Sequence, residues 1–167
     1  ILVLNAGSSS IKFAVFDGDL APRCAGIAAE IGAGGFVEVD GNRTAQPLID
    51  HRAALQAVLG ALKSKGVGLE SLRAAAHRVV HGGRKLSQPV RVNADVRAEI
   101  AACSPLAPLH NPHNLAAMDT LAELAPELAQ FASFDTAFHT TNPDVATRYA
   151  IPRMMETKGI RRYGFHG

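Results

Sequence analysis

A short segment near the start of the sequence, Asn5 to Lys12 (NAGSSSIK), combines groups that can bind a phosphate. Gly7 allows a ligand to approach the backbone closely. Serine hydroxyls and backbone N–H groups can donate to anionic oxygens, and Lys12 adds positive charge. The segment lacks the spacing of the common glycine-rich phosphate loops and joins two apolar runs instead of opening a helix. These residues predict a phosphate cradle, with an ordinary Ser/Gly hairpin turn as the alternative.

A second segment, HRVVHGG at residues 77–83, places charged and imidazole groups at the end of an apolar run. Alternation along a strand would point Arg78 and Val80 to one face at its carboxyl end, where open α/β sheets bind ligands. Arg78 could grip a carboxylate or phosphoryl group with two hydrogen bonds, beside an apolar wall formed by Val80. His77 and His81 suggest a metal pair, but their separation along a strand favours structural or packing roles.

Three further segments carry polar groups in loops. Leu109 and His110 lie in a loop stiffened by prolines, where His110 is either a hydrogen-bonding ligand group or a loop residue. Asp135 follows a short apolar run, and it could hold a metal, orient a neighbouring His or Arg, or cap a turn. His166 stands beside Phe165 near the end of the sequence. It is either a functional residue or an ordinary solvated loop histidine.

The elements around the serine-rich segment are predicted to be strands. Two apolar, partly alternating runs within residues 1–17 predict strand, turn, strand. Val37 and Val39 alternate with acidic residues after a glycine-rich bend, which predicts a third strand. An antiparallel meander is the simplest arrangement of the three.

The apolar period then changes to that of a helix. Asp50 is the predicted N-cap of this helix, and Gly66 lies just beyond its predicted end. Residues 74–80 read as a buried strand that runs into two glycines. A short strand is predicted at residues 89–92.

Two more helices are predicted from their capping residues. Asn93 or Asp95 would cap the first, and Asn111 followed by Pro112 would begin the second.

A strand at residues 130–134 completes an alternation of strands and helices that begins at Asp50. The sequence therefore predicts an α/β domain with a mixed sheet, in which a β-meander is followed by βαβ units. After His139 the chain is polar and broken by prolines. We expect a first domain over residues 1–138 and the beginning of a second over 139–167.

Composition narrows the function classes. Hydrophobic residues make up 47% and charged residues 19%, so the chain can bury a core. The net charge of +2 gives no indication of a nucleic-acid or membrane partner, and no apolar run reaches the roughly 20 residues that span a bilayer. Cys24 and Cys103 form neither a disulfide framework nor a zinc motif, so a reducing, cytoplasmic location is expected.

Taken in order, five segments resemble the acetate kinase family, of the acetate and sugar kinase, Hsp70 and actin superfamily. The segments are LNAGSSSIKF at 4–13, HRVVHGG at 77–83, LAPLHNPHNL at 106–115, FDTAFHTTNP at 134–143 and RRYGFHG at 161–167. Arg84 is a departure, because an acidic residue often follows the two glycines. The sequence ends at the fifth segment, so we expect a longer native polypeptide.

The resemblance implies an actin-like (ribonuclease H-like) fold and a reversible reaction with Mg²⁺. The γ-phosphoryl group of ATP would pass to acetate, giving acetyl phosphate and ADP, in an enzyme that is a homodimer when full length. The 167-residue chain alone is expected to be inactive. Propionate or butyrate kinase is the alternative, because one methylene changes binding by only about 1–3 kcal/mol. A non-catalytic nucleotide-binding or structural, oligomer-forming fragment is the alternative from another class.

The resemblance also implies roles for individual residues. Four would belong to the phosphate-binding hairpin: Asn5, Ser8, Ser10 and Lys12. The pocket for the methyl group, with one accessory contact, would comprise Val80, Leu109, Phe165 and His110. Arg78 would bind the acetate carboxylate and the transferring phosphoryl group, and His166 would stabilise the phosphoryl oxygens. Asp135 would orient the site through His166 or the metal, near which Asn5 would also lie.

Overall fold

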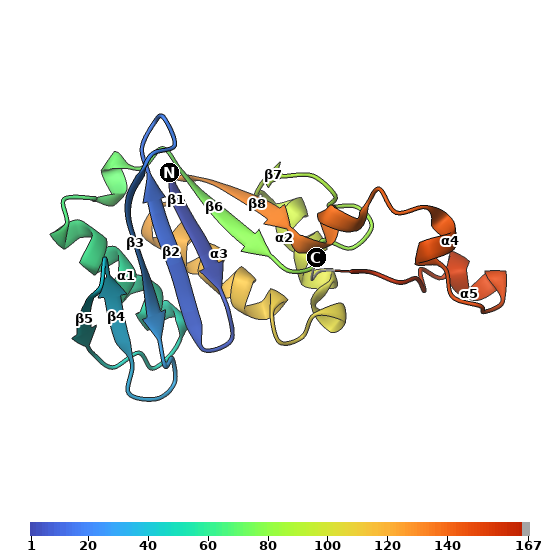
Figure 1. The fold of residues 1–167 in the computed structure, drawn as a ribbon, viewed down its shortest axis with the longest axis horizontal. Coiled ribbons are helices and arrows are strands. Elements are labelled where there is room, and N and C mark those ends of the chain that lie inside the picture. The colour runs from blue at the N-terminus through green and yellow to red at the C-terminus, as the bar shows by residue number, and fades with distance from the viewer. Residues whose placement is uncertain (165–167) are drawn as a thin grey trace.

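The computed structural model describes residues 1–164, which form one mixed sheet with helices packed behind it (Figure 1). The eight strands of these residues follow the order β5-β4-β3-β2-β1-β6-β8-β7. The strands are β1 (Leu2–Ala6), β2 (Ser10–Phe16), β3 (Pro22–Ala29), β4 (Phe36–Val39), β5 (Asn42–Ala45), β6 (Ala74–Val79), β7 (Val90–Arg91) and β8 (Ala129–Phe134). The helices are α1 (His51–Ser64), α2 (Ala94–Ala102), α3 (Asn111–Leu124), α4 (Asp144–Thr147) and α5 (Arg153–Thr157), with 3-10 turns η1 (Leu69–Ser71), η2 (Ser104–Leu106) and η3 (Asp135–His139).

The first half of the sheet is the predicted antiparallel meander, running from β1 to β5. The sequence predicts β1, β2 and β4 but not β3 or β5. All four residues of β5 are exposed, so this edge strand has no apolar alternation to reveal it. Strand β3 is rich in alanine and contains Gly26, into whose open face the Phe13 ring packs. Residues this small give a weak strand signal.

The second half of the sheet contains the predicted parallel strands. Strand β6 pairs parallel with β1, and β8 pairs parallel with β6. The carboxyl ends of these three strands therefore meet at one edge of the sheet. This mixed α/β sheet confirms the predicted fold class.

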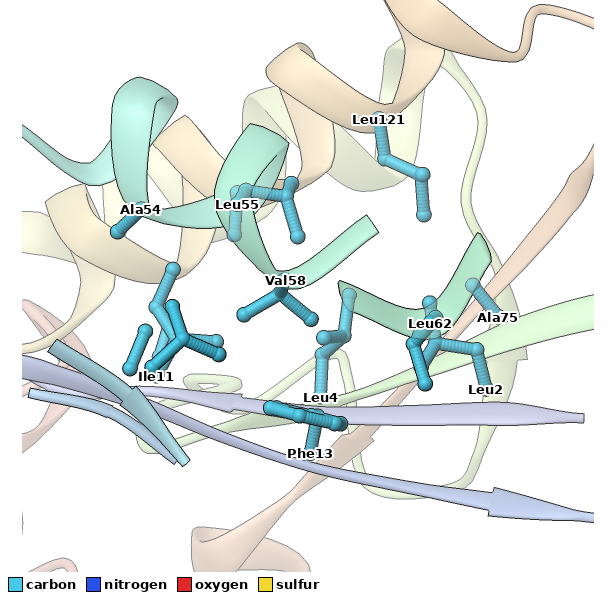
Figure 2. Close-up of a cluster of buried hydrophobic side chains, with 14 of the residues drawn as sticks. Leu2, Leu4, Ile11, Phe13, Ala54, Leu55, Val58, Leu62, Ala75 and Leu121 are labelled. Atoms are coloured by element: carbon cyan, nitrogen blue, oxygen red, sulfur yellow. The ribbon is translucent and has the colours of Figure 1, made fainter. Parts of the chain in front are cut away.

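The core lies between the sheet and the helices α1 and α3 (Figure 2). Leu4 and Phe13 point from β1 and β2 toward α1, where Val58 and Leu62 meet them. Leu121 reaches the same cluster from α3. Each side chain of this size contributes about 1.5–3 kcal/mol when fully buried. This core fixes the sheet edge on which the site is built.

The caps agree with the sequence in two helices and differ in one. Asp50 caps α1 and Asn93 caps α2, each through its side-chain oxygen. The prediction that Asn111 caps α3 is wrong, because α3 is preceded by His110 and the Asn111 side chain is buried. Its amide instead binds the backbone N–H and C=O of His81. Asn111 thus joins two elements and does not cap its own helix.

The segment that follows η3 carries α4 and α5 away from the sheet (Figure 1). Several of its apolar side chains are exposed, including Val145 and Met154. The predicted domain boundary near residue 138 stays a prediction. Within residues 1–164, no helix is both long enough and apolar enough to cross a bilayer.

Candidate functional site

The carboxyl ends of β1 and β6 border a hollow of about 270 Å³, which we call the site hollow. Its lining residues are Asn5, Ala6, Gly7, Ser8, Ser9, Ser10, Lys12, Arg78, Val80 and His110. The serine-rich segment and Arg78 are far apart in the sequence, yet they face the same space. Ser8 of the turn is exposed, whereas Val80 is buried.

Strand register explains why Asn5 and Arg78 meet. The parallel ladder pairs Leu4 with His77, so the next residues, Asn5 and Arg78, lie side by side. The Arg78 Nη1 donates a hydrogen bond to Asn5 Oδ1 at 3.3 Å. Sequence position on two adjacent strands is therefore enough to bring an amide oxygen and a guanidinium to one point.

Asp135 grips the other side of the Arg78 guanidinium. Arg78 Nε donates to Asp135 Oδ1 at 2.9 Å and Nη2 donates to Oδ2 at 2.7 Å. This hydrogen-bonded pairing raises the pKa of the Arg78 guanidinium, so the guanidinium stays positively charged. The Asp135 side chain is 14% exposed and the Arg78 side chain 46% exposed. Asp135 thus orients Arg78, one of the alternatives that its position after a strand allows.

The turn between β1 and β2, residues Gly7–Ser9, is anchored from below by α1. Gly7 donates its N–H to Ser10 O at 2.8 Å, which closes the turn. The Gly7 carbonyl lies 2.6 Å from His51 Nε2. Because a carbonyl only accepts, His51 Nε2 must carry the proton. The His51 ring also stacks on His113 of α3, with centroids 4.3 Å apart.

The first turn of α3 holds both walls of the site hollow. Asn114 Nδ2 donates to Ala6 O at 2.7 Å, and Asn114 Oδ1 accepts from the Val80 N–H at 3.3 Å. Sequence reasoning missed Asn114 and His51. The available signal for Asn114 was its position one helical turn before Met118, on the stripe that α3 buries. A polar residue on such a stripe must have buried partners.

His77 and His81 have packing roles in the structure. His77 is buried, and its Nε2 lies 2.7 Å from Gln130 Oε1. Burial lowers the pKa of His77 to about 4, so its ring is neutral. His81 Nδ1 accepts the N–H of Gly83 at 3.0 Å. Among residues 1–164, no group of three His, Cys, Asp or Glu side chains is placed to hold a metal.

The remaining predicted residues have different outcomes. Lys12 and His110 line the site hollow. Leu109, predicted for the methyl pocket, is 68% exposed and is not part of the hollow's lining, because it lies in the turn before α3 and faces solvent. Phe165 and His166 lie outside the described residues.

Comparison with known proteins decides the family. The family model described as the acetokinase family matches residues 1–167. This chain belongs to the acetate kinase family. The curated acetate kinase of Streptomyces coelicolor is 46% identical over 186 residues, and that of Deinococcus deserti is 46% identical over 173 residues. They are covered over 44% and 43% of their lengths, while 100% and 99% of this chain is matched. The chain thus spans less than half of the curated acetate kinases that it matches.

Solved structures of the acetate kinase family share the fold. The Porphyromonas gingivalis acetate kinase superposes with a TM-score of 0.89 at 38% identity, and a propionate kinase from Francisella tularensis with 0.91 at 37%. Each match covers 99% of this chain, and 45% and 44% of the other chains. The actin-like fold expected of the acetate kinase family is confirmed.

Proposed function

We propose that this chain forms part of an acetate kinase, which transfers the γ-phosphoryl group of ATP reversibly to acetate and yields acetyl phosphate and ADP. The observation that carries the proposal is the site hollow, where the serine-lined turn and Arg78 face one another. Acetate and ATP are the proposed partners, and the full-length protein is proposed to be a homodimer. Family membership supports phosphoryl transfer of this type.

The chemistry suits the residues of the hollow. Acetate is ionised at pH 7, and its own oxygen is the nucleophile, so no general base is required. The enzyme must instead align two anions and offset their repulsion, as in other loose phosphoryl transfers. Arg78, Lys12 and the donors of the β1–β2 turn can do this. Because Asp135 occupies Nε and Nη2 of Arg78, Nη1 is the nitrogen on the Asn5 side.

Magnesium is the metal that this reaction implies. Mg²⁺ usually keeps several waters and takes one or two protein oxygens together with substrate phosphates. Asn5 Oδ1 borders the hollow and, like both Asp135 oxygens, accepts a hydrogen bond from Arg78; its second lone pair fits one such ligand position. Bound Mg²⁺ would offset charge on the phosphate oxygens. Asn5 and Arg78 would then share the task of holding the phosphoryl group.

Propionate kinase is the second candidate. A solved propionate kinase has the same fold as this chain. Val80 supplies an apolar wall, but Leu109 faces solvent, so the described pocket does not set the length of the acyl chain. Comparison of kcat/KM for acetate and propionate in the full-length protein decides between the two.

The proposed function is tested by replacing Arg78. In the full-length protein that contains this chain, Arg78→Ala should lower kcat for acetyl phosphate formation about 10³-fold, the effect of removing a cation from a phosphoryl-transfer site. Arg97→Ala is the matched control, because Arg97 also grips a carboxylate, that of Asp119, and its side chain is 48% exposed. The control should keep wild-type kcat. A loss below tenfold for Arg78→Ala, or an equal loss in the control, would refute the role.

A further inference from the structure

Asn114 joins the two walls of the site hollow, and we propose that it is a positioning residue for phosphoryl transfer. Its amide sets the separation between the β1–β2 turn and the Val80 end of β6. The inference rests on the proposed function, because these two walls would hold the phosphate and the carboxylate.

Two contacts join the strands at the hollow: the side-chain bond from Arg78 to Asn5, and the Asn114 amide, which binds backbone groups of both strand ends. The parallel ladder between β1 and β6 ends at Leu4 and His77, so no ladder pair joins the strands where they border the hollow. Beyond that point, the Asn114 amide donates to Ala6 O on one strand and accepts from the Val80 N–H after the other. The buried Asn114 side chain therefore links the two strands where no ladder pair does.

The orientation of the amide is unambiguous. Ala6 O can only accept and the Val80 N–H can only donate, so each end of the Asn114 amide has one possible partner. Asn114 is 2% exposed, so water cannot take over either bond. Truncation would leave two buried backbone groups unpaired at the border of the hollow.

A small shift between the two walls would act mainly on the chemical step. Each wall would keep its own ligand groups, so binding of acetate and of MgATP should change little. The alignment of the carboxylate oxygen with the phosphorus would be lost, and a misplacement of about 1 Å can lower a rate about 10²-fold. Removal of the Asn114 amide should therefore lower kcat without a matching rise in KM.

Asn111 provides a matched control on the same helix. It is also an asparagine, is fully buried, and binds backbone groups of His81 and Ile100. Within the described residues, the Asn111 side chain makes no hydrogen bond to β1 or to the β1–β2 turn. Asn111→Ala removes bonds to the residue after Val80 but leaves the Asn114 bridge between the two walls in place, so it should destabilise the protein as Asn114→Ala does with little effect on their separation.

The experiment compares both variants in the full-length protein, with Tm, kcat and separate KM values for acetate and MgATP. Wild-type turnover establishes the proposed function first, so failure there is distinct from failure of this inference. We expect Asn114→Ala to lose about 10²-fold in kcat, with both KM values within threefold, and Asn111→Ala to keep kcat within threefold at a similar loss in Tm. Equal kcat losses in the two variants, or an Asn114→Ala variant with wild-type kcat, would overturn the inference.

A second variant covers the case in which Asn114→Ala does not fold. In Asn114→Thr the shorter side chain can bind at most one of the two backbone partners, so this variant should lose about tenfold or more in kcat with unchanged KM values. Wild-type kcat in Asn114→Thr, or a loss that appears only as raised KM, would contradict the positioning role.

Discussion

Arg78 combines two properties at the residue scale, since Asp135 and Asn5 hold its guanidinium while nearly half of its side chain stays exposed. Asp135 fixes Nε and Nη2, while 46% of the side chain stays open to solvent. An unrestrained arginine carries about 2 kcal/mol of rotamer entropy that ligand binding would have to overcome. The pairing with Asp135 removes much of that freedom before a substrate arrives. The cation is thus preorganised for a small anion.

This arrangement predicts a specific effect of Asp135→Asn. The substitution keeps the shape of the side chain but removes the charge and one of the two acceptors for Arg78, so the guanidinium should lose its fixed direction. In the full-length protein we expect kcat to fall about tenfold to 10²-fold. Asp119→Asn, which releases Arg97 at the surface, is the control and should leave kcat unchanged. The role of Asp135 would be excluded by wild-type turnover in steady-state assays of Asp135→Asn.

Sequence patterns were sufficient at the element scale where one physical signal dominated. The helical period and the Asp50 cap predict α1, and alternation around the serine-rich turn predicts β1 and β2. The fully exposed strand β5 carries no such period. Asn111 has the residue type of a cap, but its amide stabilises a distant strand end instead. That choice depends on tertiary contacts, which no local pattern contains.

The same limit applies to the candidate site. Residue type and spacing identify the serine-rich turn and Arg78, because anion binding requires their groups. They do not identify Asn114 or His51, which bind the backbone carbonyls of Ala6 and Gly7. Any sequence presents such carbonyls, so only the packing of α1 and α3 against the turn reveals which side chains bind them.

The strand pair β6–β8 makes a pH-dependent contribution to stability. His77 on β6 is buried against Gln130 on β8, and its pKa is lowered to about 4 from a usual 6.5. Between these values the unfolded chain binds a proton that the folded chain does not, so stability rises with pH in this window and falls as pH drops from 6.5 toward 4. The full shift corresponds to a change of about 3 kcal/mol in the free energy of unfolding.

The His77→Gln variant tests this contribution. Tm measured from pH 4 to 7 should depend less steeply on pH in His77→Gln than in wild type. Burial also lowers the pKa of His81 and His113, so parallel curves for the two proteins would disprove only the His77 contribution.

At the scale of the whole molecule, the site hollow lies on an open edge of this chain. Ser8 and Ser9 are exposed, and Arg78 is nearly half exposed. Apolar side chains of η3 and of the segment after it are also uncovered, among them Phe138 at 76% and Val145 at 82%. The chain spans 44% of the Streptomyces coelicolor relative. In a longer protein, further residues could cover both surfaces.

The openness of the hollow leads to a prediction for the isolated 167-residue polypeptide. Closing an active site expels water, which strengthens the electrostatic interactions inside it. Because the turn and Arg78 are exposed in the described residues, they would interact with their anions in a high dielectric, where a charge pair at 4 Å gains about 1 kcal/mol. We therefore expect no ATP-dependent acetyl phosphate from the purified 167-residue chain under conditions in which the full-length protein turns over. Arg78→Ala in the full-length protein gives the background of the assay. Turnover by the isolated chain above that background would show that residues 1–167 contain the whole catalytic machinery.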